Sequence, residues 1–240
     1  MGKYQISGGV RQSALKIVVY GPEGIGKTTF SACFPNPVFI DTEGSTKFFD
    51  IKRFPDPSSW EMLLDEVQDV VDNPTLCDTL VVDTLDWAER LCIKEVCESN
   101  RKKGIEDFGY GKGYTYTYEA FAKLLHKLDD VSNNGVNVVV NAHAMLRKFE
   151  QPDEMGSYDR WELKLINSPK ANICGMVKEW ADMVIFANYK TYVVAADKDG
   201  KKHKAQGGKR IMNMNHNPCW DAKNRFGFMD EMDFNYNDIS

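Results

Sequence analysis

No stretch of this 240-residue sequence is apolar over the length that a membrane-spanning helix needs. The first residues, Met1 to Gln5, also lack the apolar core of a secretory leader. Both absences argue against a membrane protein and against an exported one. We therefore expect a cytoplasmic protein that makes no contact with a membrane.

Cysteine pairs of the metal-binding kind are missing as well. The sequence has six cysteines, and none of them forms a C-x-x-C pair. Cys92 and Cys97 are five positions apart on a predicted helix, which does not fit the spacing of a zinc ribbon or knuckle. In the reducing cytosol we expect free thiols.

An excess of positive charge is also absent. Lys and Arg total 30 against 35 Asp and Glu, which gives a net charge of −5. Nucleic-acid binding would therefore need a local basic patch rather than a global excess. With 42% hydrophobic and 27% charged residues, the composition is that of an ordinary globular protein, and the length fits one large α/β domain.

A complete phosphate-binding motif, G-x-x-x-x-G-K-[ST], occupies residues 21–28. It follows the apolar strand pattern of residues 15–20 and precedes a segment that can open a helix. The glycines let successive N–H groups cradle phosphate oxygens, the lysine reaches the β- and γ-phosphates, and the threonine hydroxyl can bind Mg²⁺. The motif predicts that the chain binds a nucleoside triphosphate, identified as ATP once the family resemblance below is included, together with Mg²⁺, through Gly21, Glu23, Gly24, Gly26, Lys27, Thr28 and Thr29.

Strand and helix patterns alternate along the rest of the chain. Further strands are predicted over residues 37–41, 79–83, 136–141 and 183–187, and helices over 58–72, 87–99, 118–131 and 176–180. Ser58 or Ser59 is a candidate N-cap of the first of these helices. Residues 189–196 and 210–214 flank a turn at 197–200, which indicates an antiparallel hairpin at the sheet edge. A long polar stretch covers about 145–171.

These patterns predict a mostly parallel, doubly wound α/β sheet with helices on both faces and a C-terminal antiparallel hairpin. We divide the chain into an N-terminal extension (1–13), an ATPase domain (14–229) and an acidic C-terminal tail (230–240). Because the tail carries four acidic residues, we expect it to be mobile.

Acidic residues at strand ends are candidates for the chemistry. Asp83 ends a buried strand, where a carboxylate can support Mg²⁺. Glu43 follows the neighbouring strand, and we choose it as the acid that activates water, with Asp41 as its competitor. Asp86 and Glu89 are interpreted as a solvated helix start. His143 is either a γ-phosphate sensor or a structural residue.

Together these segments resemble a RecA-type recombinase core. The resemblance is carried by Gly21–Thr29, Phe39–Glu43, Val81–Thr84, Ala142–His143 and Ala181–Phe186. Lys223–Gly227 repeats the five-residue signature of the RadA branch. The chain lacks RadA's zinc finger and protease-like domain, and its compact layout is similar to minimal RecA-like ATPases of bacteriophages that act with single-strand annealing proteins.

The resemblance implies a RecA-like core, DNA-stimulated ATP hydrolysis in phage recombination or annealing, and a single-strand binding or annealing protein as a possible partner. It also implies a homo-oligomer, filament or ring, with ATP between subunits. Lys223, with Arg225 as a second candidate, would then approach the ATP of the next subunit.

In RecA-like folds two loops face the DNA, and both have candidate counterparts here. The first offers Lys102, Lys103, Tyr110, Lys112 and Tyr114, and the second Arg147 and Lys148, followed by Arg160, Lys164 and Lys170. Cations would meet phosphates and aromatic rings would stack on bases of single-stranded DNA. The alternative is a pair of solvated loops.

Two other functions remain open at this point. A P-loop phosphotransferase for a small molecule would use the same motif, although the arginines are dispersed rather than gathered in a lid. An ATP-gated DNA loader would bind ATP without significant turnover. ATPase assays with and without single-stranded DNA separate the three.

Overall fold

Parallel strands form the centre of the structure, a computed structural model that describes residues 8–9, 13–151, 155–195 and 203–240. They are β1 (Lys16–Gly21), β2 (Pro37–Asp41), β3 (Lys52–Arg53), β4 (Thr79–Asp83), β5 (Asn137–Glu150) and β9 (Met183–Ala195). Two antiparallel strands, β10 (His203–Asn213) and β11 (Glu231–Asp233), extend one edge. The order β11-β10-β9-β1-β5-β4-β2-β3 places β1 between β9 and β5.

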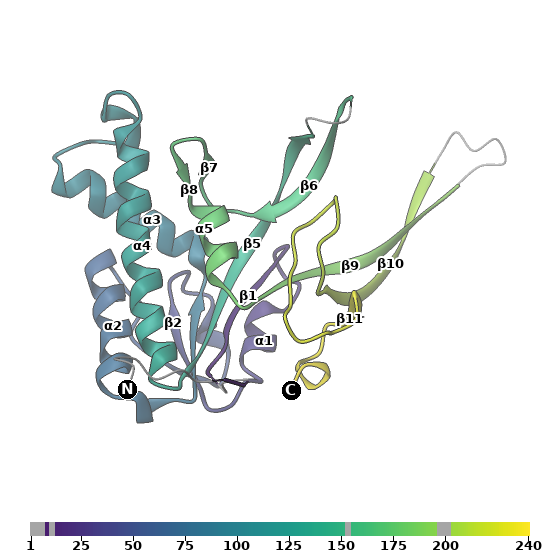
Figure 1. Cartoon of the computed structure of the whole chain (residues 1–240), viewed down its shortest axis with the longest axis horizontal. Helices are drawn as coiled ribbons and strands as arrows, with labels where there is room; N and C mark the ends of the chain where they lie inside the picture. The colour runs from purple at the N-terminus through teal and green to yellow at the C-terminus, as the bar shows by residue number, and fades with distance from the viewer. Residues whose placement is uncertain (1–7, 10–12, 152–154, 196–202) are drawn as a thin grey trace.

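The two faces of the sheet are covered by different elements, because successive strand residues point to opposite sides. Val18 and Tyr20 of β1 pack in the core shared with the larger helices, whereas Ile17 and Val19 pack on the other face with α1 (Lys27–Ser31). The larger helices are α2 (Trp60–Asp72), α3 (Leu85–Ser99), α4 (Lys112–Asn133) and α5 (Ile173–Trp180). Figure 1 shows these layers, and the predicted fold class is confirmed.

Several element boundaries differ from the prediction. Helix α2 begins at Trp60 rather than at residue 58, because its N-cap is Ser59, one of the two predicted candidates, whose hydroxyl accepts from the Met62 amide at 3.1 Å. Helix α4 begins at Lys112 rather than near Tyr118. Strand β5 does not end at Asn141 but continues to Glu150, because β6 (Ser157–Leu163) pairs with its outer half. Short elements complete the fold: β7 (Asn167–Ser168), β8 (Ala171–Asn172), η1 (Thr46–Phe48), η2 (Pro74–Leu76), η3 (Ile105–Asp107) and η4 (Tyr236–Asp238).

The acidic C-terminal segment is not a mobile tail, so that expectation was wrong. Strand β11 pairs with β10, the Phe234 ring stacks on Phe30 at 4.6 Å between centroids, and Tyr236 packs on Phe34 at 4.6 Å. The prediction of a mobile tail rests on the acidic residues, but apolar side chains occupy every second position between them, as in a β-strand. The segment therefore covers the α1 face of the sheet.

Two hairpins extend beyond the sheet on the same side, β5–β6 and β9–β10 (Figure 1). The second confirms the predicted antiparallel hairpin, while its predicted turn at 197–200 lies outside the described residues. So do residues 1–7 and 10–12 of the predicted N-terminal extension. Within the described part of the chain, no helix is long and apolar enough to cross a membrane.

Candidate nucleotide-binding site

The phosphate loop joins β1 to α1 at the carboxyl end of the central strand. Gly24 and Gly26 have φ values of 74° and 105°, in the left-handed region that favours glycine. The Lys27 side chain is buried, and its Nζ donates to the carbonyls of Gly21 and Pro22 at 3.2 Å each. Burial lowers the pKa of Lys27, while nearby carboxylates, Asp83 first, oppose that shift. The loop thus holds a cation at its centre.

Asp83 and Thr28 form a pair of oxygen ligands beside this loop. The Thr28 hydroxyl donates to Oδ2 of Asp83 at 2.7 Å. Burial raises the pKa of Asp83, even though the hydrogen bond from Thr28 acts to lower it. Within the described residues, no group of three or more His, Cys, Asp and Glu side chains is placed to hold a metal. Two protein oxygens fit Mg²⁺, which takes its other ligands from phosphates and water.

Asp41 and Glu43 occupy the same turn but have different surroundings. Oδ1 of Asp41 accepts from the amides of residues 43–45, and Oδ2 accepts from the amide and hydroxyl of Thr46. Asp41 therefore organises the turn. Glu43 is half-buried. Burial raises its pKa, as do the carboxylates of Asp83 and Asp86, whereas His143 lowers it.

His143 is fixed by Asp86, which is 4% exposed and not the solvated residue that the sequence suggested. The His143 amide donates to Asp86 Oδ1 at 3.0 Å, and the ring Nδ1 lies 3.0 Å from Oδ2. Burial raises the pKa of Asp86, but the hydrogen bonds and charge of His143 outweigh it, so the pKa is lowered overall. Glu89 is also buried, and its Oε1 accepts a hydrogen bond from the Ile166 amide at 2.7 Å. The start of α3 is covered by β5 and the segment after β6.

One cavity of about 460 Å³ brings the predicted site residues together. Its lining includes Glu23, Gly24, Gly26, Lys27, Thr28, Thr29, Glu43, Asp83 and His143, while Gly21 ends the strand beneath it. Sequence reasoning missed Arg210, which lines the same cavity from β10 and donates to the Ile25 carbonyl at 3.3 Å. Nothing local marked Arg210, since it reaches the loop only through strand pairing.

Lys223 and Arg225 do not reach this cavity. The Lys223 backbone exchanges hydrogen bonds with Val184, its Nζ donates to the Glu179 carbonyl at 3.2 Å, and it lines a different cavity. Arg225 lies 3.8 Å from Asp182, just before β9 begins, whereas the phosphate loop follows the carboxyl end of β1. The RadA-like signature predicts these two cations near the ATP of a neighbouring subunit, and in the structure both lie outside the phosphate cavity of their own chain.

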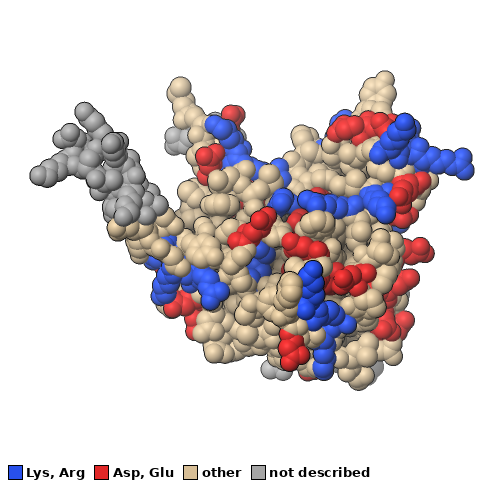
Figure 2. All heavy atoms as spheres, turned by 180° about the vertical axis from the view of Figure 1, so that it is seen from behind, with Lys and Arg blue, Asp and Glu red and all other residues tan. Residues whose placement is uncertain are grey.

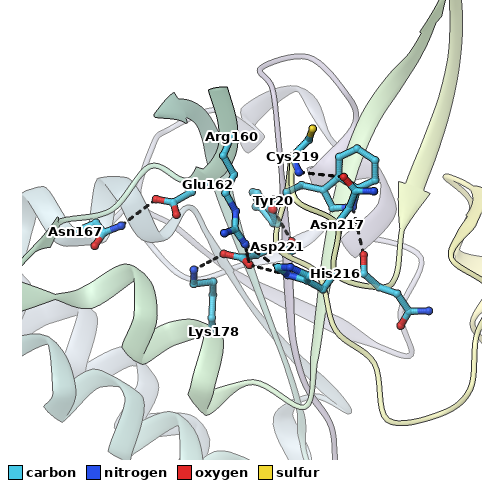
Figure 3. A network of polar contacts seen from close by, with 11 residues as sticks. Tyr20, Arg160, Glu162, Asn167, Lys178, His216, Asn217, Cys219 and Asp221 are labelled. Carbon is cyan, nitrogen blue, oxygen red and sulfur yellow. Dashed lines mark hydrogen bonds and ion pairs between the residues drawn. The ribbon is translucent and has the colours of Figure 1, made fainter. Parts of the chain in front are cut away.

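A charged network anchors the segment that carries Lys223 (Figure 3). The Asp221 carboxylate pairs with Arg160 of β6, Lys178 of α5 and His216. The Asp221 carbonyl accepts from the Tyr20 hydroxyl at 2.5 Å. Because the Asp221 carboxylate joins Arg160 to Lys178 and to the His216 ring, Arg160, a DNA candidate of the sequence, is engaged within the fold.

The remaining DNA candidates do not line the cavity, and they lie between α3 and α4, in the first turn of α4, on β5 and near β7 and β8. Tyr110 is 94% exposed, Lys102, Lys103 and Lys112 are exposed, and the Tyr114 hydroxyl donates to Glu106. Lys170 donates to the Tyr110 carbonyl, which brings the turn between β7 and β8 to this loop. On β5, Lys148 is exposed, whereas Arg147 bonds Glu162 and the Leu165 carbonyl. Figure 2 shows positive and negative side chains interspersed on the face opposite to the view of Figure 1.

Comparisons with known proteins address the family. The model of the AAA domain matches residues 13–226. A KaiC-like protein from Pyrococcus horikoshii is similar in structure, with a TM-score of 0.45 and 14% identity over 91% of this chain and 84% of that one. The flagellar accessory protein FlaH from Methanocaldococcus jannaschii has a TM-score of 0.45 and 10% identity, with the same coverage. No curated protein matches in sequence. The family match spans nearly the whole described sheet and its phosphate loop, and the chain therefore belongs to the AAA-domain family of P-loop ATPases.

Proposed function

We propose that the protein hydrolyses ATP and binds single-stranded DNA, in phage DNA recombination or annealing. The observation that carries the ATPase part is the single cavity lined by Lys27, Thr28, Glu43, Asp83 and His143. Lys27 and Thr28 come from α1 and Glu43 from the turn after β2, whereas Asp83 ends β4 and His143 lies on β5. These side chains therefore converge only in the folded chain. The RecA-like resemblance supports the DNA part.

Each residue has a role that follows from its surroundings. Lys27 would contact the β- and γ-phosphates, and Thr28 with Asp83 would hold Mg²⁺, which would neutralise charge at those phosphates. Glu43 orients and deprotonates the attacking water. Its raised pKa suits a general base, and both oxygens of its competitor Asp41 are engaged by the turn. His143, held by Asp86, reports on the γ-phosphate to the outer half of β5.

We further propose that ATP binds between protomers of a homo-oligomer. Lys223 and Arg225 lie outside the cavity of their own chain, which supports a role toward a neighbour. A cation supplied in trans stabilises transition-state charge and accelerates related reactions by about 10³- to 10⁵-fold. A single-strand binding or annealing protein is a further proposed partner.

An ATPase assay with and without single-stranded DNA tests the proposal. Hydrolysis that needs Mg²⁺, rises with DNA and disappears in Lys27→Ala supports it. Turnover that requires a small-molecule acceptor identifies a phosphotransferase instead. Tight ATP binding with no turnover under either condition identifies an ATP-gated loader.

A further inference from the structure

A second cavity of about 470 Å³ adjoins the phosphate cavity. Gly26, Thr29 and Arg210 line both, so the two spaces meet at the phosphate loop. A Cβ atom at Gly26 would lie 2.8 Å from Nη1 of Arg210 and 4.0 Å from the Phe234 ring. The C-terminal segment therefore reaches the last glycine of the motif.

The wall of this second cavity is aromatic on one side and polar on the other. Phe30 of α1 and Phe234 are nearly parallel, at an angle of 11°, and Tyr236 closes the same side. The polar side comes from β10 and β11, where Lys209 pairs with Asp233 at 2.5 Å, and from Asn235 just after β11. Flat apolar surface beside hydrogen-bonding groups suits a heteroaromatic ring joined to a hydroxylated sugar.

The wall is held in place by the fold. Strand β11 pairs with β10 through Ile211–Asp233, Met212–Met232 and Asn213–Glu231. Arg210 also lies on β10 and contacts the loop through the Ile25 carbonyl. The cavity wall and the phosphate loop are thus joined by one strand.

We propose that this second cavity holds the purine nucleoside of the triphosphate, with residues 233–236 forming its wall. The inference rests on the proposed nucleotide function, because the phosphates must lie over Lys27 for the nucleoside to lie here. It assigns the C-terminal segment a binding role in place of the mobile tail that its charge suggested.

Cysteine alkylation tests this in the unmodified protein. Cys33 is exposed and lines the second cavity, while Cys219 is exposed elsewhere and serves as an internal control. ATP with Mg²⁺ at ten times its Kd should slow alkylation of Cys33 by N-ethylmaleimide about tenfold, by mass action. Alkylation of Cys219 should be unchanged. Inorganic tripolyphosphate, which carries no nucleoside, should bind the loop yet leave Cys33 reactive.

A variant gives a second, independent measurement. Phe234→Ala should weaken ATP binding by about tenfold or more, on the scale of one lost stacking contact, without changing tripolyphosphate binding. Ile239→Ala, which packs on the same core but does not line the cavity, is the matched control. Mass-spectrometric mapping of 8-azido-ATP crosslinks to residues 233–236 supports the proposal even if Phe234→Ala folds poorly.

The outcomes separate the two proposals. If ATP and tripolyphosphate bind equally well and neither protects Cys33, the nucleoside lies elsewhere while the phosphate site stands. If wild type and Lys27→Ala both bind neither ligand, the nucleotide function fails and this inference fails with it.

Discussion

Asp41 and Glu43 show how two acids in one turn come to differ. Asp41 ends β2 and Glu43 follows it, and the sequence alone left them as competitors for one role. The backbone of residues 43–46 folds around Asp41 and engages both of its oxygens, whereas Glu43 lines the cavity. Hydrogen bonding, which the sequence does not display, separates the structural acid from the candidate base.

Glu43→Gln should therefore reduce ATP turnover by about 100-fold while leaving ATP binding and thermal stability unchanged, because it removes only the proton acceptor. Asp41→Asn is the matched comparison. It replaces an acceptor with a donor that faces backbone N–H groups, so it should destabilise the fold by about 1–3 kcal/mol. Turnover, ATP affinity and melting temperature should be measured for both. If Asp41→Asn is stable and inactive while Glu43→Gln is active, the roles are reversed.

Glu66 on α2 is a buried acid outside the site. It is 7% exposed, and neither oxygen has a hydrogen-bond partner among the described residues. Burial, helped by the charge of Asp56, raises its pKa from 4.5 to about 7. The Glu66 carboxyl group therefore binds its proton more tightly in the folded state than in the unfolded state. The resulting stability is complete below pH 4.5 and is lost as the pH rises through about 7.

Glu66→Gln should accordingly stabilise the protein at pH 8 and have little effect at pH 4.5. The gain at pH 8 should be about 3 kcal/mol, the free energy that corresponds to a pKa raised from 4.5 to about 7. Urea unfolding at both pH values measures it. Glu61→Gln, at an exposed position of the same helix, should give no pH-dependent gain. An equal effect of Glu66→Gln at both pH values would contradict the assignment.

At the scale of elements, the sequence predicted correctly those features that depend only on residues close together in the chain. The phosphate loop, the strands with alternating or continuous apolar residues and the Ser59 cap are set by neighbours along the chain. Non-local pairing decided what the prediction missed. The outer half of β5 finds a partner in β6, and the C-terminal segment finds β10 and α1. Both segments are rich in polar or charged residues, and this composition gave no indication that they pair with other strands.

The loop between α3 and α4 remains the proposed DNA element. Changing Lys102, Lys103 and Lys112 together to Ala should weaken binding to single-stranded DNA and lower the slope of log affinity against log salt by about 2. Lys52, Lys94 and Lys123, exposed elsewhere on the surface, form a control triple that removes the same charge. Fluorescence anisotropy over a salt series measures both. Equal slopes in the two triples would move the DNA site away from this loop.

At the scale of the whole molecule, the cations of the RadA-like signature lie away from the cavity of their own chain. Asp221, joined to β6 and α5, anchors the segment that carries them. The positions of Lys223 and Arg225 follow from strand β9 and could not be predicted from the motif alone. A role for them in hydrolysis therefore needs a second protomer.

Mixing Lys27→Ala with Lys223→Ala should restore ATPase activity that neither protein has alone. In a mixed assembly, an intact phosphate loop of the second protein meets an intact Lys223 of the first. Lys27→Ala mixed with Glu43→Gln is the control, and it should restore nothing, because both changes lie in the cavity of one protomer. ATPase rates and light scattering should be followed together. Mixed assemblies without recovery in the first pair would show that Lys223 does not act in trans.

The distribution of the cavity along the chain has a consequence for synthesis. Its lining runs from Glu23 to Arg210, and the adjoining wall reaches Tyr236. A nascent chain that has only its phosphate loop outside the ribosome cannot complete this lining, however well its first strands pair. Ligand binding stabilises only the state that binds. Truncated translation products should therefore gain nothing from ATP, which makes nucleotide-dependent resistance to proteolysis a test of whether a chain has been translated far enough.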